Sequence, residues 1–394
     1  MGQSVNAMAA REIFGAPAPA GEANYRPVGS VRALDWQAMH SPQQIGRWEA
    51  LARCASQPNP FYEHWFLLPS LKVFDPRGSV KLLCLEVDGQ LAGLMPVHRN
   101  SSYYGYPLPD IRNWLHANAF CGQPLVAAGM EALFWREVLA WCDRHAGSRL
   151  FLHLMQQPGE GVLHEALKFL LESEQRPAAT VQDEERAMLQ TSLDAESYLQ
   201  QSLTQKKRKE LRRQQRRLGE EGTLEITRTR DGEDADAWID SFLQLEASGW
   251  KGRAGSALVA DGDTARMFRA TMRAAAARGK LERLTMTLDG KPVAMLATLL
   301  SPPGAYSFKT AFDEDFARFS PGVVLQVENL ALAEDNAVGW IDSCAVQDHK
   351  MTDHLWRQRR RMSGHSIAIG GAIRRTIFCQ LSRRETVKPA GGIA

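Results

Sequence analysis

The chain of 394 residues predicts an α/β (α+β) protein made of two tandem copies of one unit. Each half holds an apolar segment, an Asp-Gly pair and a second apolar segment, at Asp88-Gly89 and again at Asp289-Gly290. Asp-Gly between two apolar runs is a strong signal for a β-hairpin. An aromatic-rich segment and a helical pattern follow each hairpin, the helical patterns at 131–145 and 321–337. The repeated order therefore indicates an internal duplication.

The composition is that of a globular protein with a large core, because 44% of the residues are apolar and 23% are charged. A polar stretch with Pro177, within residues 175–194, interrupts the periodicity and marks the expected linker. The start of the chain is rich in Ala, Gly and Pro, as is typical of a mobile leader. The expected domains are a leader at 1–30, an N-terminal domain at 31–190, a C-terminal domain at 191–385 and a flexible tail at 386–394.

Cysteine and histidine spacing gives no sign of disulfides or a metal site. The six cysteines include no C-x-x-C pair, and neighbouring histidines lack the i, i+4 spacing of a zinc motif. The chain also shows neither a secretory signal nor the roughly 18 apolar residues in a row that cross a bilayer. We expect a cytoplasmic protein without metal or membrane span, and the oligomeric state stays open.

Residues 206–217 hold eight basic residues against the single acid Glu210, although the net charge of the chain is only +2. The pattern predicts one helix over 194–218, with Asp194 as its N-cap and Gly219 as its stop. Two interpretations stay open, a solvated charged face or attraction of an anionic partner such as coenzyme phosphates, tRNA, an acidic polysaccharide or a membrane surface. Sequence-specific reading of nucleic acid is not favoured, because no aromatic residues are interleaved with the charges.

A second helix is expected to begin at Ser320-Pro321-Gly322. Serine is a good N-cap, proline suits the first helical position, and glycine allows a ligand to approach the backbone. The N-terminus of a helix offers unpaired N–H groups and a partial positive charge to anions. The amides of Gly322, Val323 and Val324 are therefore candidates for binding a phosphate.

Several segments of the second half together resemble the GNAT acyltransferase superfamily, and within it the CelD-type branch. This branch is related to the Fem-type aminoacyl transferases, which carry two GNAT units in tandem. The resemblance implies two tandem GNAT-like domains, each with a mixed central sheet flanked by helices. The segments that carry it are 207–213, 249–252, 308–313, 319–322 and 342–345.

The usual GNAT pyrophosphate signature is absent, and residues 318–324 stand in its place. The donor therefore stays open between acyl-CoA and aminoacyl-tRNA. The resemblance implies an N-acyltransferase that uses acetyl-CoA and an amine of a sugar or small metabolite, with a link to polysaccharide biosynthesis. The alternatives are a Fem-type ligase that uses aminoacyl-tRNA and a catalytically silent adaptor that keeps the fold.

In the architecture that the resemblance implies, the donor lies between two splayed strands and its pyrophosphate meets a helix N-terminus. The donor-binding candidates in this chain are Tyr306, Phe308, Lys309, Ser320, Pro321, Gly322, Val323 and Val324.

Acyl transfer to an amine needs a proton acceptor, and polar loops that follow strands commonly hold such groups. The catalytic candidates are Asp342, Asp348 and His349 at the end of the last strand, with Asp313 as a further one. Each has an ordinary alternative: a loop cap for Asp342, a surface position for His349, and a turn or ion pair for Asp313.

Acceptor-binding candidates lie in both halves. Trp250 and Lys251 stand in a glycine-rich loop that could close over the acceptor, although Trp250 could equally pack in the core. Tyr104 and Tyr106 of the first half could stack on a sugar. We expect no second active site in the first half, because no Ser-Pro-Gly sequence follows its hairpin.

Overall fold

The computed structural model describes residues 28–349 and 351–385. The expected tail, and the expected leader up to residue 27, lie outside the described residues. Strand β1 spans Gly29–Asp35, so the last residues of the expected leader belong to a strand. Among the described residues, no helix is both long and apolar enough to cross a membrane.

The chain divides into two compact units. Unit 1 comprises residues 28–71, 75–184 and 361–385 of the described chain, and unit 2 comprises 72–74 and 185–360. Two of the boundaries fall within strands, between Glu184 and Glu185 and between Arg360 and Arg361, whereas the short segment 72–74 ends a helix.

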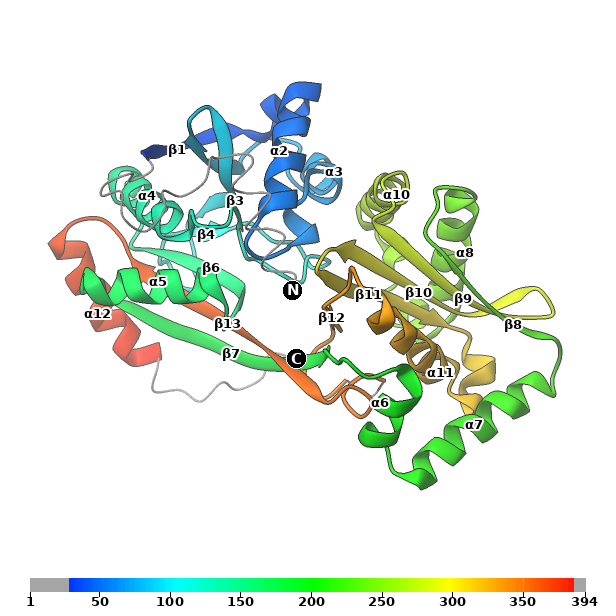
Figure 1. The fold of residues 1–394 in the computed structure, drawn as a ribbon. Helices are drawn as coiled ribbons and strands as arrows, with labels where there is room; N and C mark the ends of the chain where they lie inside the picture. The colour runs from blue at the N-terminus through cyan, green and yellow to red at the C-terminus, as the bar shows by residue number, and fades with distance from the viewer. Residues whose placement is uncertain (1–27, 350, 386–394) are drawn as a thin grey trace, which may run out of the picture. The chain divides into compact units, whose positions relative to one another are not determined.

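Unit 1 is a mixed sheet with helices on its faces (Figure 1). Its strand order is β1-β2-β3-β4-β6-β13, with β5 paired to β3. Neighbours are antiparallel except β4 and β6, which run parallel. The strands after β1 are β2 (Lys81–Val87), β3 (Gln90–Asn100), β4 (Asp110–Asn113), β5 (Leu125–Val126), β6 (Phe151–Pro158), β7 (Ala178–Leu189) and β13 (Gln358–Ala368). The helices are η1 (Trp36–His40), α2 (Pro42–Cys54), η2 (Pro60–Tyr62), α3 (His64–Phe74), α4 (Glu131–His145), α5 (Val162–Ser173) and α12 (Ala372–Glu385).

Both faces of the unit 1 sheet are buried. Successive side chains of β2 point to opposite faces, and residues of both sets are buried. Leu83 and Leu85 belong to one core cluster with Phe134 of α4. Leu82 and Cys84 point to the opposite face and are equally buried. The unit therefore has helices on two sides of one sheet, with α4 and α5 on the first.

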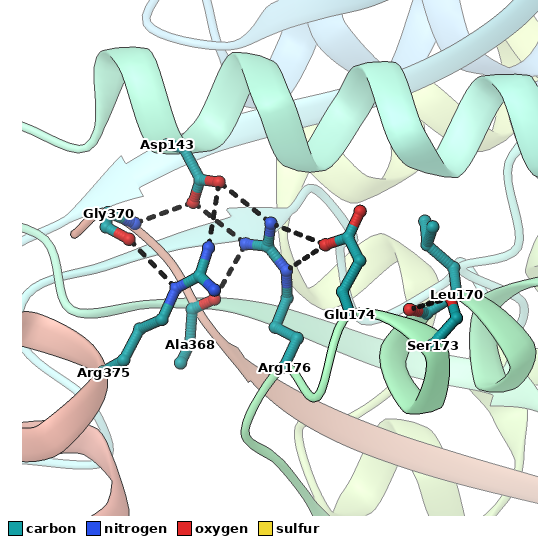
Figure 2. A network of polar contacts seen from close by, with 8 residues as sticks. All are labelled: Asp143, Leu170, Ser173, Glu174, Arg176, Ala368, Gly370 and Arg375. Carbon is teal, nitrogen blue, oxygen red and sulfur yellow. Dashed lines mark hydrogen bonds and ion pairs between the residues drawn. The ribbon is translucent and has the colours of Figure 1, made fainter. Parts of the chain in front are cut away.

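The end of the chain belongs to unit 1, whereas the sequence assigned residues 361–385 to the C-terminal domain. Strand β13 pairs with β6, and a polar network then holds the segment after it to α4 (Figure 2). The carboxylate of Asp143 accepts from both terminal nitrogens of Arg176 at 2.9 Å, from the Gly370 amide at 2.8 Å and from Arg375 at 3.3 Å. A buried guanidinium between two acids is costly to separate from them, so this network fixes the C-terminal segment in place.

Unit 2 is also a mixed sheet, with strand order β7-β12-β11-β10-β9-β8. Neighbours are antiparallel except β11 and β12, which run parallel. Its strands after β7 are β8 (Leu224–Thr229), β9 (Leu281–Leu288), β10 (Lys291–Ser301), β11 (Gly304–Phe312) and β12 (Trp340–Asp342). Its helices are α6 (Ala195–Ser202), α7 (Gln205–Gly219), α8 (Ala235–Ser248), α9 (Trp250–Arg253), η3 (Leu258–Ala260), α10 (Gly262–Ala276), η4 (Glu314–Phe319), α11 (Pro321–Glu328) and η5 (Asn329–Glu334).

Helices cover both faces of the unit 2 sheet. The contacts of β9 show which helix lies on which face. Leu284 and Met286 pack in one cluster with Val324 of α11. Thr285, between them, accepts a hydrogen bond at 2.7 Å from the indole of Trp238 in α8. Alternate residues of a strand point to opposite faces, so α11 and α8 lie on opposite sides of the sheet. With the two mixed sheets flanked by helices, the predicted fold class is confirmed.

The two hairpins expected from the Asp-Gly pairs are present and share their geometry. Asp88 and Gly89 have φ of 50° and 76°, and Asp289 and Gly290 have φ of 49° and 75°. Two successive residues with positive φ make the turn that suits a two-residue hairpin. Each hairpin also shifts register just beyond the turn, in β3 and in β10. This agreement in detail supports the internal duplication.

The expected helix over 194–218 is two helices, α6 and α7. Asp194 caps only α6, by accepting from the Ser197 amide at 2.9 Å. Leu203 is extended, and Thr204 then caps α7 by accepting from the Lys207 amide at 3.3 Å. Because Thr204 is a second good N-cap, one helix can end at Ser202 and another can begin at Gln205. The pattern of basic residues does not reveal this interruption.

The parallel strands of unit 1 part after the pair Arg112–His153, and the chain itself fills the gap. The Asn113 side chain accepts from the Met155 amide at 2.7 Å and donates to the Met155 carbonyl at 3.1 Å. The backbone of Gly122 lies alongside, and its amide donates to the Gln156 carbonyl at 2.8 Å. The gap beyond the parallel pair in unit 1 is therefore occupied by hydrogen-bonded side-chain and backbone groups of the chain itself.

We predict that Gly122→Ala destabilises the protein by roughly 1–3 kcal/mol, because an added Cβ would lie 2.1 Å from the Met155 carbonyl oxygen and 2.3 Å from Asn113 Nδ2. Gly46→Ala is the matched control. Gly46 lies in α2 with nothing within 4 Å of an added Cβ, so alanine there should stabilise by up to about 1 kcal/mol. Urea denaturation of both variants measures the difference, and equal stability would show that the gap in unit 1 is not tightly filled.

Candidate functional site

Strands β11 and β12 run parallel for three residue pairs, the last of which is Tyr306 with Asp342, and then part. Beyond this pair β11 continues to Phe312. The chain after β12 turns towards β7, where the Ser343 amide donates to the Ala187 carbonyl at 3.1 Å. The expected pair of splayed strands is therefore present in unit 2.

A β-bulge lies in β11 just beyond the point where the strands part. Ala297 of β10 pairs with Lys309, and Thr298 pairs with Ser307, so Phe308 is the extra residue. A bulge changes the direction in which the next side chains point, and bulges are frequent beside active sites.

Beyond the bulge, the side chains of β11 point to opposite faces of the sheet. Phe308 stacks on Phe268 of α10 with ring centroids 6.3 Å apart, and Lys309 Nζ lies 5.7 Å from the Phe308 ring. On the other face, Gln326 of α11 donates to the Thr310 hydroxyl at 3.3 Å. Lys309 thus lies on the side of α8 to α10, away from α11.

Two of the expected donor-binding residues, Tyr306 and Phe308, are core residues. Tyr306 has no exposed surface and packs edge-on against Trp340 at 5.3 Å, and Phe308 is 3% exposed. Their side chains are occupied by packing, so a donor at this strand would meet the backbone of β11.

Helix α11 begins at Pro321, as the sequence predicted, but Ser320 does not cap it with its side chain. Ser320 has φ of 52°, and its carbonyl instead accepts from the amides of Val323 and Val324 at 2.9 and 3.0 Å. A Cβ on Gly322 would lie 2.8 Å from the Met351 sulfur. The expected free amides of Val323 and Val324 are therefore engaged, and the positive end of the helix dipole is what remains for an anion.

Asp342 is a buried partner of two arginines. Its Oδ2 accepts from Arg186 of β7 at 2.6 Å and from Arg360 of β13 at 2.7 Å, and Oδ1 accepts from the Cys344 amide at 2.9 Å. Burial would raise the pKa of this carboxyl, but the two guanidiniums outweigh burial and hold the pKa below its usual value. Asp342 has no exposed surface, so its geometry is that of a structural anion and not of a base that meets a substrate.

The other catalytic candidates lie in three different settings. Asp313 accepts from the Asp315 amide at 3.0 Å and so caps η4. Asp348 is exposed, with φ of 61°. His349 is partly buried, with Nδ1 3.4 Å from the Thr352 hydroxyl. Burial is the main cause that lowers the pKa of His349, with Asp353 opposing the shift and Lys251 adding to it.

The structure adds an acid that the sequence analysis missed, Glu246 at the end of α8. Glu246 is 4% exposed, and its Oε1 accepts from Lys251 Nζ at 2.8 Å while Oε2 accepts from the Leu258 amide at 2.8 Å. Lys309 faces this pair, and burial with the charge of Lys251 lowers the pKa of its ammonium to about 8. The available signal was a glutamate directly after Phe242-Leu243-Gln244-Leu245, at the end of a mostly apolar segment.

The loop with Trp250 and Lys251, expected as a mobile lid, is held by Glu314. That carboxylate accepts from the Trp250 amide and from Arg253. The loop also passes so close to α8 that a Cβ on Gly252 would lie 1.8 Å from a backbone carbonyl oxygen. The indole of Trp250 is nevertheless 53% exposed, which leaves it available to a ligand.

Tyr104 and Tyr106 belong to unit 1, where they are 55% and 62% exposed. They stand in a tight turn in which Tyr103 and Tyr106 exchange backbone hydrogen bonds at 2.9 Å. The guanidinium carbon of Arg112 lies 5.7 Å from the Tyr104 ring. An exposed, well-supported aromatic pair is consistent with stacking on a sugar.

Helix α7 carries the basic segment on its surface. Arg212 pairs with Glu196 at 2.7 Å and Arg213 with Glu210 at 2.8 Å, all of them largely solvent-accessible. A hollow of about 400 Å³ lies along the start of the helix. Its lining residues are Gln205, Lys206, Lys209, Glu210 and Arg213.

Comparison with known proteins agrees with this geometry. Residues 205–351 match the model of the family described as acetyltransferase (GNAT) domain. The matched stretch lies in unit 2 and contains β11, the bulge, α11 and β12, so unit 2 is similar to a GNAT acetyltransferase domain. A search of the curated proteins finds no match.

Solved structures with the same fold cover most of the chain. FemX is 10% identical with a TM-score of 0.56, over 86% of this chain and 98% of that one. A conserved protein of unknown function from Bacteroides thetaiotaomicron VPI-5482 is 10% identical with a TM-score of 0.51, over 86% of this chain and 99% of that one. The likeness extends over both units and concerns the fold.

We predict that Asp342→Asn lowers the free energy of unfolding by roughly 3–5 kcal/mol, because two buried guanidiniums lose their counter-charge. The folded pKa of Asp342 is depressed, so its stabilisation is present above the ordinary pKa of about 3.9 and is lost as pH falls through the folded value. Urea denaturation at neutral and acid pH measures both effects. The exposed Asp348→Asn should change stability by less than about 0.5 kcal/mol. A stable Asp342→Asn that loses only turnover would instead make Asp342 catalytic.

Proposed function

We propose that unit 2 is an N-acyltransferase that moves an acyl group, with acetyl-CoA as donor, onto an amine of a sugar or small metabolite. The parting of β11 and β12 beside the start of α11, inside the stretch that matches the GNAT domain, is the observation that carries this function. The filled gap in unit 1 supports unit 2 as the location of the reaction. The resemblance to the CelD-type branch supports a sugar amine and a link with polysaccharide biosynthesis.

The donor supplies an activated acyl group in this proposal, and the chain positions it. The backbone of β11 beyond Tyr306 is no longer paired with β12, and in this proposal the donor lies along that edge of the strand. The dipole of α11 attracts the donor phosphates at Pro321-Gly322. Thr310, on the α11 face, completes a polar wall along this path.

His349 is the base that best fits the geometry. An imidazole with a lowered pKa is neutral at pH 7 and can accept a proton from the amine. Asp342, in contrast, is committed to Arg186 and Arg360. In this assignment Asp342 positions the end of β12, and His349 follows on the loop that β12 leads into.

A second candidate is a Fem-type ligase that takes its acyl group from aminoacyl-tRNA. Two observations favour it: the fold likeness to FemX and the exposed cations of α7. Lysines at 206, 207 and 209 are exposed on the first turns of that helix and would attract a phosphate backbone.

We expect acetyl-CoA at 100 times its dissociation constant to stabilise the protein by about 2.7 kcal/mol in a thermal-shift titration. Val323→Glu should weaken this binding about tenfold or more, because the partly exposed Val323 lies in the first turn of α11 and a carboxylate there repels phosphate. The fold should persist, since helix N-termini favour acidic side chains. Val323→Gln, of equal size and without charge, is the control.

The outcomes of this titration separate the proposals. No shift with acetyl-CoA, together with binding of aminoacyl-tRNA that falls steeply with salt, would favour the Fem-type ligase. No response to either donor would leave a catalytically silent adaptor. Equal loss in the glutamate and glutamine variants would place the phosphates away from α11.

We predict that His349→Gln lowers kcat/KM about 10²- to 10⁴-fold while acetyl-CoA still binds. In the wild type the rate should fall as pH drops below the lowered pKa of His349, because the imidazole then carries a proton. The variant should lack this acid limb. The exposed His354 on the same segment provides the control, His354→Gln. An unchanged acid limb in His349→Gln would exclude His349 as the base.

A further inference from the structure

Helix α7 carries most of its exposed basic residues on one face. It lies at the periphery of unit 2 (Figure 1), and its packed side is marked by Leu211 and Leu218, which are 7% and 0% exposed. Successive residues of a helix are about 100° apart around its axis. Five exposed basic residues lie within an arc of about 100° on the side opposite these leucines. They form the basic face and are Lys206, Lys209, Arg213, Arg216 and Arg217.

The basic face carries a surplus of positive charge. Glu210 pairs with Arg213 at 2.8 Å and Glu220 pairs with Arg216 at 3.5 Å. The other three members form no ion pair with another described residue. All these groups are accessible to solvent, where ion pairs contribute little to stability. The stability of the fold therefore does not account for the charge of this face.

The start of the basic face has a place for a single anionic group. The hollow of about 400 Å³ is lined by three of the five cations, Lys206, Lys209 and Arg213, together with Gln205 and Glu210. Lysine binds a phosphate as a point charge, and arginine binds it through a planar fork of N–H groups. Three cationic side chains around one space suit a phosphate group.

The arrangement of these cations distinguishes a flat partner from a grooved one. The basic face spans residues 206–217, which is roughly 16 Å along the helix axis. A plane of anions touches one face of a helix, so all five cations can reach it together. A helix in the major groove of a duplex has phosphates on its two flanks, while its inner side meets base edges. Of the exposed basic residues of α7, only Lys207 and Arg212 lie off the basic face, and Arg212 pairs with Glu196 at 2.7 Å.

We propose that the basic face is a docking surface for an anionic phospholipid bilayer. A bilayer presents its phosphates in a plane, and each lysine or arginine near an anionic surface adds to an attraction that salt screens. The hollow receives one headgroup phosphate, and the rest of the face lies along the surface. Both leucines of α7 are buried in unit 2, so the contact is electrostatic and nothing apolar is inserted. The helix has no aromatic residue for stacking on single-stranded bases.

The experiment is co-sedimentation of the full chain with vesicles of phosphatidylcholine alone or with about 30% phosphatidylglycerol, in about 100 mM salt. We expect the apparent Kd for the anionic vesicles to be lower by about tenfold or more, and to rise with salt. Docking at a bilayer is independent of the proposed acyl transfer, so this measurement needs no donor. Binding of the wild type to both kinds of vesicle alike, or to neither, would overturn the proposal.

Replacing four cations of the basic face by glutamine should weaken binding to anionic vesicles about tenfold or more, because the surplus charge is then removed. Glutamine forms helix about as well as lysine and arginine, so α7 should persist, and urea denaturation checks this. The variant combines Lys206→Gln, Lys209→Gln, Arg213→Gln and Arg217→Gln.

A matched control removes four exposed charges outside α7 and should bind within about threefold of the wild type, because distant charges are screened. It combines Arg32→Gln, Arg77→Gln, Arg144→Gln and Lys291→Gln, all at exposed positions. The two variants have the same net charge. Equal loss of binding in both would show that net charge alone matters and would contradict a basic face.

A third variant, Lys207→Gln with Arg212→Gln, examines the shape of the partner. These two residues lie off the basic face, so vesicle binding should change by less than about threefold. A loss as large as that of the four-residue variant would rule out a flat contact. Transfer RNA is the competing probe: if it displaces the wild type from the vesicles, and this displacement needs Lys207 and Arg212, α7 belongs to a nucleic-acid site and the bilayer proposal fails.

Discussion

The geometry of unit 2 depends on the buried ion pairs of Asp342. This carboxylate brings together Arg186 of β7 and Arg360 of β13 at the end of β12. Arg360 also lies over the rings of Trp340 and Tyr306, which are the two sides of the parallel strand pair. Because a buried charge tolerates no loss of its partner, these contacts fix the place where β12 ends. The parting of β11 and β12 lies at the same point, because Asp342 is the last residue of β12 that pairs with β11.

The two units share one strand arrangement, but the space beyond their parallel strand pairs differs. Both units have an Asp-Gly hairpin and a parallel strand pair that parts after three residues. In unit 1 the Asn113 side chain and the backbone of Gly122 occupy the gap with saturated hydrogen bonds. In unit 2 the strand beyond the gap is bulged at Phe308. The gap in unit 1 is therefore filled by hydrogen-bonded groups of the chain itself, whereas the strand that continues past the gap in unit 2 changes direction at a bulge.

The charges of unit 2 fall into classes with different physical roles. The Asp342 pairs lie in the core, where Asp342 has no accessible surface and both arginines are at most 5% exposed, so their role is structural. Glu246, which is 4% exposed, accepts from Lys251 Nζ and from the Leu258 amide, so this ion pair holds the start of α9 to the end of α8. The arginines and lysines of α7 are exposed, where ion pairs contribute little to stability and act mainly through long-range attraction. The extent to which a charged side chain is buried therefore distinguishes structural ion pairs from charges that act at long range.

The sequence by itself determined the local elements. Asp-Gly fixed both hairpins, Pro321 fixed the start of α11, and apolar spacing predicted α4 with its observed limits, because turn chemistry and periodicity act over a few residues. The tertiary structure alone decided which side chains meet. Arg186 and Arg360 stand 156 and 18 residues from Asp342 along the chain, and only the folded sheet brings the three side chains together. It also decided that β13 returns to unit 1, because strand partners are chosen by packing between distant segments and leave no local signal.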